Sequence, residues 1–162
     1  MKTPFIKYVP TEICANLKWR AKVHRRVMDD PSYASTVWDA CAADPLFYIS
    51  GFGFTYDPRP GTFGRRPFIL WPIQHWGLRE ILDSIGKYDL LIDKSRDMGA
   101  SWMCVLAYEW RWHFHREQSF LLGSRDATYV DNAANPKSLF WKIDFFHRSL
   151  PPWLMPHGFK YS

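Results

Sequence analysis

One ten-residue segment carries side chains that suit the binding of a phosphate group. Residues 93–102 read D-K-S-R-D-M-G-A-S-W and contain Lys94, Arg96 and Ser101, with Gly99 just before the hydroxyl. Lysine and arginine supply positive charge, and a serine hydroxyl can bind the Mg²⁺ that accompanies a nucleotide. A short apolar run precedes the segment and a helix-like apolar pattern follows it. This order predicts a loop between a strand and a helix, whose backbone N–H groups bind an anion.

The lysine of this loop stands at the opposite end from its usual position. The pattern G-x-x-x-x-G-K-[ST] would place a glycine at Lys94 and the lysine at Ala100. A loop that curls around a phosphate brings its ends together, so the flexible Lys94 side chain can reach the β- and γ-phosphates from the other side. Arg96 would neutralise charge on the γ-phosphate, as an arginine finger in cis does. We therefore predict Lys94 and Arg96 as catalytic residues; an ordinary strand–turn–helix with a solvated surface is the alternative.

A glutamine upstream of the loop has the chemistry needed to read adenine. Residues 66–74 read R-P-F-I-L-W-P-I-Q, and Gln74 offers a paired donor and acceptor to the edge of a base. Phe68 and Trp71 offer aromatic faces for stacking, although for Trp71 alone the aromatic start of a helix is the simpler interpretation. The order of aromatic, proline, glutamine, helix, strand and phosphate loop predicts a nucleotide site.

Together these residues resemble the large terminase subunit of tailed bacteriophages, the ATPase that pumps DNA into the procapsid. Residues 67–74 resemble the adenine-recognition motif of that family, and residues 94–101 resemble its deviant Walker A, in which some members carry the lysine at the start of the loop. The resemblance implies that Gln74 reads adenine, that Lys94 is the phosphate lysine and that Ser101 lies on the Mg²⁺ side.

The chain departs from a second pattern in the same family. Other members have an arginine where Arg96 stands and a conventional lysine where Ala100 stands, so the role of Lys94 is inferred from the first pattern only. The resemblance covers residues 40 to 160. The nucleotide-binding residues that it implies are Trp71, Gln74, Lys94, Ser95, Arg96, Asp97, Met98, Gly99, Ala100, Ser101 and Trp102.

The resemblance also implies cofactors, partners and a place of action. The cofactors are ATP and Mg²⁺, and the partners are double-stranded DNA, the small terminase subunit and a portal protein. Such a motor is a homo-oligomer when assembled, in the host bacterial cytoplasm of a phage or prophage and transiently at the procapsid portal. Because residues 123–162 contain no Walker B pattern, we expect an N-terminal piece of a larger ATPase that is poorly active alone. Another helicase-like translocase and a non-catalytic DNA-binding or assembly module are the alternatives.

The expected fold class is α/β, with an incomplete parallel sheet of the P-loop NTPase (RecA/ASCE-like) type. Alternating strands and helices predict such a sheet, with ligands at the carboxyl ends of its strands. We place a helical, lid-like N-terminal subdomain and linker at 1–61, and the start of the ATPase core at 62–162. In the core, apolar patterns predict strands at 89–93 and 120–123 and helices at 76–87, 101–116 and 138–150.

The first 61 residues give separate signals. Residues 11–44 read as helical with a break at Asp30-Pro31, whereas alternating aromatics at 48–56 predict a strand or hairpin arm before a turn-rich linker at 57–61. A basic cluster in the first helix either contacts DNA phosphates or forms a solvated face. Its members are Lys18, Arg20, Lys22, Arg25 and Arg26.

Composition excludes several classes of protein. Hydrophobic residues make up 47% of the 162 residues and aromatic residues 18%, which argues against disorder. The net charge of +5 is consistent with a polyanionic partner. Three widely spaced cysteines form neither a zinc pattern nor a disulfide framework, so we expect a reducing cytosol, and no apolar run is long enough for a membrane span. His113 and His115, two residues apart on a helix, do not share a face and are expected to be ordinary packing or surface residues.

Overall fold

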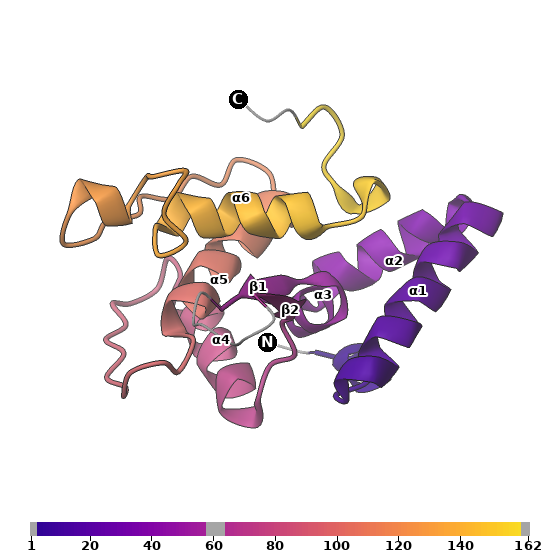
Figure 1. The fold of residues 1–162 in the computed structure, drawn as a ribbon, viewed down its shortest axis with the longest axis horizontal. Coiled ribbons are helices and arrows are strands. Elements are labelled where there is room, and N and C mark those ends of the chain that lie inside the picture. The colour runs from indigo at the N-terminus through magenta and orange to yellow at the C-terminus, as the bar shows by residue number, and fades with distance from the viewer. Residues whose placement is uncertain (1–2, 58–63, 160–162) are drawn as a thin grey trace. The chain divides into compact units, whose positions relative to one another are not determined.

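The structure, a computed structural model, describes residues 3–57 and 64–159. The chain divides into two compact units. We call residues 70–143 the mid-chain unit, and residues 2–69 together with 144–162 the two-segment unit (Figure 1). The boundary expected at 61/62 lies outside the described residues. Of the helices described, none combines the length and the apolar character needed to cross a bilayer.

The prediction of a parallel sheet of the P-loop type was wrong. The structure is 56% helical, and its described strands form a single two-stranded antiparallel sheet. Residues 89–93 and 120–123 are neither helix nor strand. Leu91 is 94% exposed and Leu121 is 97% exposed, so each of these apolar runs leaves a leucine uncovered. A strand requires a ladder of hydrogen bonds to another strand, and an apolar pattern alone cannot supply that partner.

The two-segment unit begins with the helices that the sequence predicts. Helix α1 (Ile13–Asp29) and helix α2 (Ser32–Ala43) pack on each other, and the chain breaks between them at Asp30-Pro31, as predicted (Figure 1). Glu12 caps α1, because its carboxylate accepts hydrogen bonds from the backbone N–H groups of Cys14 and Ala15. A short 3-10 helix, η1 (Ile6–Tyr8), precedes them.

Helix α3 (Pro45–Phe52) replaces most of the strand predicted at 48–56. Asp44 caps it with one carboxylate oxygen, which accepts from the backbone N–H groups of Leu46 and Phe47 at 3.0 Å each. Pro45 stands at the first helical position, where its missing N–H costs nothing. All eight residues of α3 are buried. Most of the alternating aromatics therefore belong to a helix that is buried on all sides. The sequence pattern of such a helix can resemble that of a buried strand.

A hairpin and the C-terminal segment complete the two-segment unit. Strand β1 (Phe54–Tyr56) pairs antiparallel with strand β2 (Arg65–Pro67), with Thr55 opposite Arg66. The last helix, α6 (Leu139–Ser149), is shared between the two units, and a 3-10 helix, η3 (Pro152–Leu154), follows it. Aromatic contacts bind these elements: the ring centroids lie 5.5 Å apart in the pair Tyr48–Phe146 and 5.7 Å apart in the pair Phe52–Trp153.

The mid-chain unit is built on two packed helices. Helix α4 (Pro72–Ser84) contacts helix α5 (Ala100–Phe114), and the connection between them forms neither helix nor strand (Figure 1). Both helices were predicted, with bounds shifted by a few residues. A 3-10 turn, η2 (Ala127–Tyr129), follows Asp126. The buried apolar residues of α4 and α5 include Leu78, Ile81, Leu82, Met103, Leu106 and Trp110.

Candidate functional site

Gln74 joins the two segments that the sequence associates with a nucleotide. It lies in the first turn of α4, where its Oε1 accepts a hydrogen bond from the backbone N–H of Trp71 at 3.0 Å. Its Nε2 donates to the backbone carbonyl of Met98 at 3.1 Å. The side chain is 5% exposed. The predicted adenine reader is therefore a buried residue that caps its own helix and fixes the end of the predicted phosphate loop.

The backbone of the loop is curled by left-handed residues. Asp97 has φ 63° and Gly99 has φ 76°. Residues other than glycine adopt this left-handed backbone conformation at a cost in free energy. A Cβ atom at Gly99 would lie 2.9 Å from Nε2 of Gln74. Gly99 is the N-cap of α5, so both its backbone conformation and the closeness of Gln74 require glycine at this position.

The predicted phosphate ligands lie on the exposed part of this loop. Lys94 and Arg96 are exposed, and neither side chain forms a hydrogen bond or ion pair with another described residue. Ser101 is exposed in the first turn of α5. Because Gly99 provides no side-chain cap, the backbone N–H groups of Ala100 and Ser101 have no partner within the described residues. Such N–H groups at a helix start suit an anion.

The remaining predicted residues divide into two groups. Ser95 is exposed like its neighbours on the loop, and Met98 and Ala100 are half-buried. Trp71 is 57% exposed and lies just before α4. Trp102 is half-buried, and the Lys142 ammonium lies 6.0 Å from its ring centroid. Trp71 and the loop therefore offer an accessible surface, whereas Trp102 is partly covered.

Lys142 is a buried lysine that sequence analysis did not single out. It is 6% exposed, and its Nζ donates to the backbone carbonyls of Lys137 at 2.6 Å and Ser138 at 3.1 Å. Burial lowers the pKa of its ammonium to about 8, because the charged form loses hydration. The only signal in the sequence was a lysine on the apolar side of a predicted helix.

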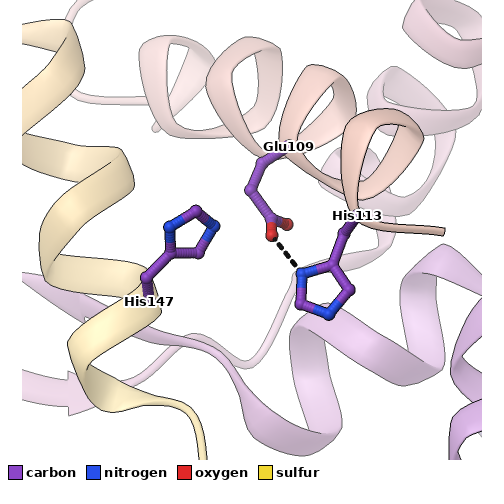
Figure 2. A group of neighbouring side chains, drawn as sticks. All are labelled: Glu109, His113 and His147. Carbon is purple, nitrogen blue, oxygen red and sulfur yellow. Dashed lines mark hydrogen bonds and ion pairs between the residues drawn. The ribbon is translucent and has the colours of Figure 1, made fainter. Parts of the chain in front are cut away.

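Helix α5 also buries an acid–base pair. Nδ1 of His113 lies 2.9 Å from Oε1 of Glu109, and both side chains have no exposure (Figure 2). The spacing of four residues puts the two side chains on one face of the helix. His147, also drawn in Figure 2, belongs to the two-segment unit, where its ring packs against Phe159 at a centroid distance of 5.2 Å. The E-x-x-x-H spacing of Glu109 and His113 was visible in the sequence, but the prediction considered His113 only with His115.

The other residues considered in the sequence show packing roles. His115 follows the end of α5 and meets Trp110 edge-to-face at 4.9 Å. Burial lowers the pKa of His115, with a further contribution from the positive charge of Arg111. Cys14, Cys41 and Cys104 are free thiols, and burial raises the pKa of the Cys41 thiol well above its ordinary value, which makes it unreactive.

No family model, curated protein or solved structure matches this chain.

Proposed function

We propose that this chain is the ATP-binding part of a DNA-packaging motor of the large terminase type, in which ATP hydrolysis moves double-stranded DNA. The observation that carries the proposal is the pair of hydrogen bonds made by Gln74, which link Trp71 to Met98. Two motifs that resemble those of one family meet at this side chain, which bonds to a residue 24 positions further along the chain. The residues proposed to bind the nucleotide come from one loop and from the starts of α4 and α5.

The triphosphate end of the site is electrostatically suited to its ligand. The first N–H groups of α5 point out of the helix start, and the positive end of the helix dipole lies there. Lys94 and Arg96 add two mobile positive charges with no ion-pair partner in the described part of the chain. In this proposal Lys94 binds the β- and γ-phosphates and Arg96 stabilises charge on the γ-phosphate.

The residues present also fit a bound Mg²⁺. The Ser101 side chain is exposed beside those N–H groups, and a hydroxyl oxygen is a ligand that Mg²⁺ accepts together with phosphate oxygens. When bound, the ion would neutralise charge on the terminal phosphates. Ser101 would hold the ion, and the α5 start would orient the phosphates.

The adenine end of the site combines an aromatic surface with an amide. Trp71 is 57% exposed, and an exposed indole can stack on a base. Gln74 uses one acceptor site and one N–H in its bonds to the protein. An amide has a second N–H and a second lone pair, and these would contact the base edge. We propose that Gln74 both positions the loop and reads adenine.

Binding of a fluorescent ATP analogue in the presence of Mg²⁺ tests the proposal. Lys94→Ala should weaken binding by about tenfold or more, because a charge-assisted contact to phosphate is worth roughly 1.5–3 kcal/mol. Lys137→Ala removes an equal charge from an exposed lysine and should leave the affinity unchanged.

Three results would count against this function. Equal losses in Lys94→Ala and Lys137→Ala would show that only net charge matters. If inorganic triphosphate displaced the fluorescent analogue as well as ATP does, the proposed contacts of Trp71 and Gln74 with the base would be contradicted. No binding at all by the wild-type chain would contradict the nucleotide site as a whole.

A further inference from the structure

Helix α1 carries a concentration of positive charge. Between Ile13 and Met28 the sequence contains lysine and arginine but no aspartate or glutamate, and the acids lie only at its ends, as the N-cap Glu12 and the last residue Asp29. The five cationic residues are Lys18, Arg20, Lys22, Arg25 and Arg26. The structure shows that they divide into residues with an internal role and residues that face solvent.

Two of the five cationic side chains, Arg20 and Arg26, make contacts within the two-segment unit. The Arg20 guanidinium donates to Oδ1 of Asn16 at 2.6 Å and to the backbone carbonyls of Ser50 and Gly53 at 3.0 Å each. These carbonyls lie at the C-terminal end of α3, so Arg20 caps that helix and complements its dipole. The guanidinium of Arg26 lies 3.8 Å from the ring centroid of Tyr33. Both side chains therefore make contacts within the protein itself.

The other three cations form one exposed stripe. The side chains of Lys18, Lys22 and Arg25 are exposed, and none forms a hydrogen bond or ion pair with another described residue. At about 100° per residue they lie within roughly 60° of one another around the helix axis. The buried residues Asn16 and Val23 lie on roughly the opposite side. We call Lys18, Lys22 and Arg25 the α1 stripe.

The surroundings of the α1 stripe fit a polyanion better than a protein. The exposed apolar side chains Leu17 and Met28 lie at the edge of the solvent-facing surface, whereas the charges occupy its centre. A protein interface has the reverse order, with an apolar centre and a polar rim. The stripe extends about 10 Å along the axis, a length that meets about three phosphates on one strand of a DNA duplex.

We propose that the α1 stripe binds the phosphate backbone of double-stranded DNA without reading its sequence. The proposal rests on the DNA partner of the proposed function, but not on the nucleotide site, which lies in the mid-chain unit. Its cations act as mobile charges that displace counterions from the duplex. Affinity for DNA then depends on salt and on these three side chains, and it is the same for unrelated sequences of equal length.

The test is the salt dependence of binding to a labelled 30-base-pair duplex. In the triple variant Lys18→Gln, Lys22→Gln, Arg25→Gln, the slope of log K against log salt should fall by about one for each lost phosphate contact. Its affinity at low salt should fall by about tenfold or more. The matched control is Lys87→Gln, Arg116→Gln, Lys137→Gln, which removes two lysines and one arginine that are exposed in the mid-chain unit.

Each outcome decides one claim. A lower slope in the α1 triple variant, with a wild-type slope in the control, supports the inference. If both triple variants lose slope equally, or if only the control does, the α1 stripe is not the DNA surface, and the proposed function stands with DNA bound elsewhere. If the wild-type chain binds MgATP but no duplex, both the stripe and the DNA partner are contradicted, while the nucleotide site is retained.

An acidic protein is the other class of partner that a basic helix can attract. Polyglutamate of matched charge serves as the probe for it. If polyglutamate binds more tightly than the duplex, and the α1 triple variant loses that binding, the stripe is a protein-docking surface and the DNA proposal is overturned. Circular dichroism of the variant should match that of the wild type, because all three side chains point to solvent.

Discussion

The side-chain amide of Gln74 donates to the backbone carbonyl of Met98 over 3.1 Å. This bond fixes the first turn of α4 to the residue that precedes Gly99, the N-cap of α5. A side chain that the sequence associates with ligand recognition thus holds together the backbone of the candidate site. Substitutions that break this bond should therefore change the stability of the protein.

Substitution of Gln74 should loosen the loop. In Gln74→Glu the acceptor for the Trp71 N–H is kept, but an acceptor replaces the donor that faces Met98. We expect a loss of about 1–3 kcal/mol in the free energy of unfolding, since buried polar groups lose their partner. Urea unfolding gives this value, and hydrogen exchange should show faster exchange near residue 98. Gln118→Glu is the control, because Gln118 makes only an exposed contact of 3.3 Å to a backbone carbonyl. Equal effects of the two changes would contradict the positioning role.

Alanine at two glycines separates backbone strain from crowding. Gly86 has φ 74°, and a Cβ atom there would have no described neighbour within 4 Å, whereas Gly99 has φ 76° and the Gln74 amide at 2.9 Å. Both substitutions should cost about 1–2 kcal/mol for the left-handed backbone. Gly99→Ala should cost about 1 kcal/mol more, because the amide must give up its bond to Met98.

The extra cost should depend on Gln74. In a Gln74→Ala background the additional effect of Gly99→Ala over Gly86→Ala should disappear, since the crowded atom is gone. Thermal or urea unfolding of the four variants completes the cycle. Additive effects would show that the two residues are not coupled.

Stability should rise with pH through the titration of Lys142. Its pKa is about 8 in the folded protein, against an ordinary value of 10.5. Below pH 8 both states carry the charge, so the cost of burying it is present in full. Between pH 8 and 10.5 the folded state releases the proton while the unfolded state retains it, and the free energy of unfolding rises.

The comparison that isolates this effect is Lys142→Met. The free energy of unfolding of the wild type minus that of Lys142→Met should increase between pH 7.5 and pH 10.5, values chosen to bracket the two pKa values. Lys137→Met, which replaces an exposed lysine, is the control for the loss of one positive charge. A flat difference for Lys142 would mean that its ammonium is not desolvated.

Substitution of Asp44 should lower the free energy of unfolding more than substitution of most other polar residues. The Asp44 carboxylate is fully buried and accepts four backbone N–H bonds, two from the cap of α3 and two from Phe5 and Ile6 at 2.8 and 2.9 Å. Asp44→Asn turns one oxygen into a donor that faces two donors, and should cost about 3 kcal/mol. Asp126→Asn, at an exposed cap that accepts from Thr128, should cost clearly less than Asp44→Asn. Similar losses at the two positions in urea unfolding would refute this account.

Local signals in the sequence predicted most of the helices. The proline after Asp30 marks the break between α1 and α2, and the apolar spacing after Trp71 and Gly99 predicts α4 and α5. The error at α3 has a local cause as well: a helix buried on all sides has no polar face, so its aromatic residues resembled a strand. Asp44 followed by Pro45 was the signal that pointed to a helix start.

Strands depend on partners that lie far away in the chain, and this is where sequence reasoning was wrong. Residues 89–93 and 120–123 have the composition of buried strands, yet the described structure gives them no strand to pair with. The exposure of Leu91 and Leu121 follows directly. Composition sets a preference for extended structure, but hydrogen bonds between separate segments decide whether a sheet forms.

The sequence by itself determined most of the helices and the group of residues with the chemistry to bind a phosphate, because these depend on neighbours within a few positions. Only the tertiary structure decided that Gln74 reaches Met98, that Gly99 has no room for a side chain, and that Lys142 is buried while Lys94 is exposed. Those outcomes depend on how distant segments pack, since packing sets which polar groups lose water and which atoms come within hydrogen-bonding distance.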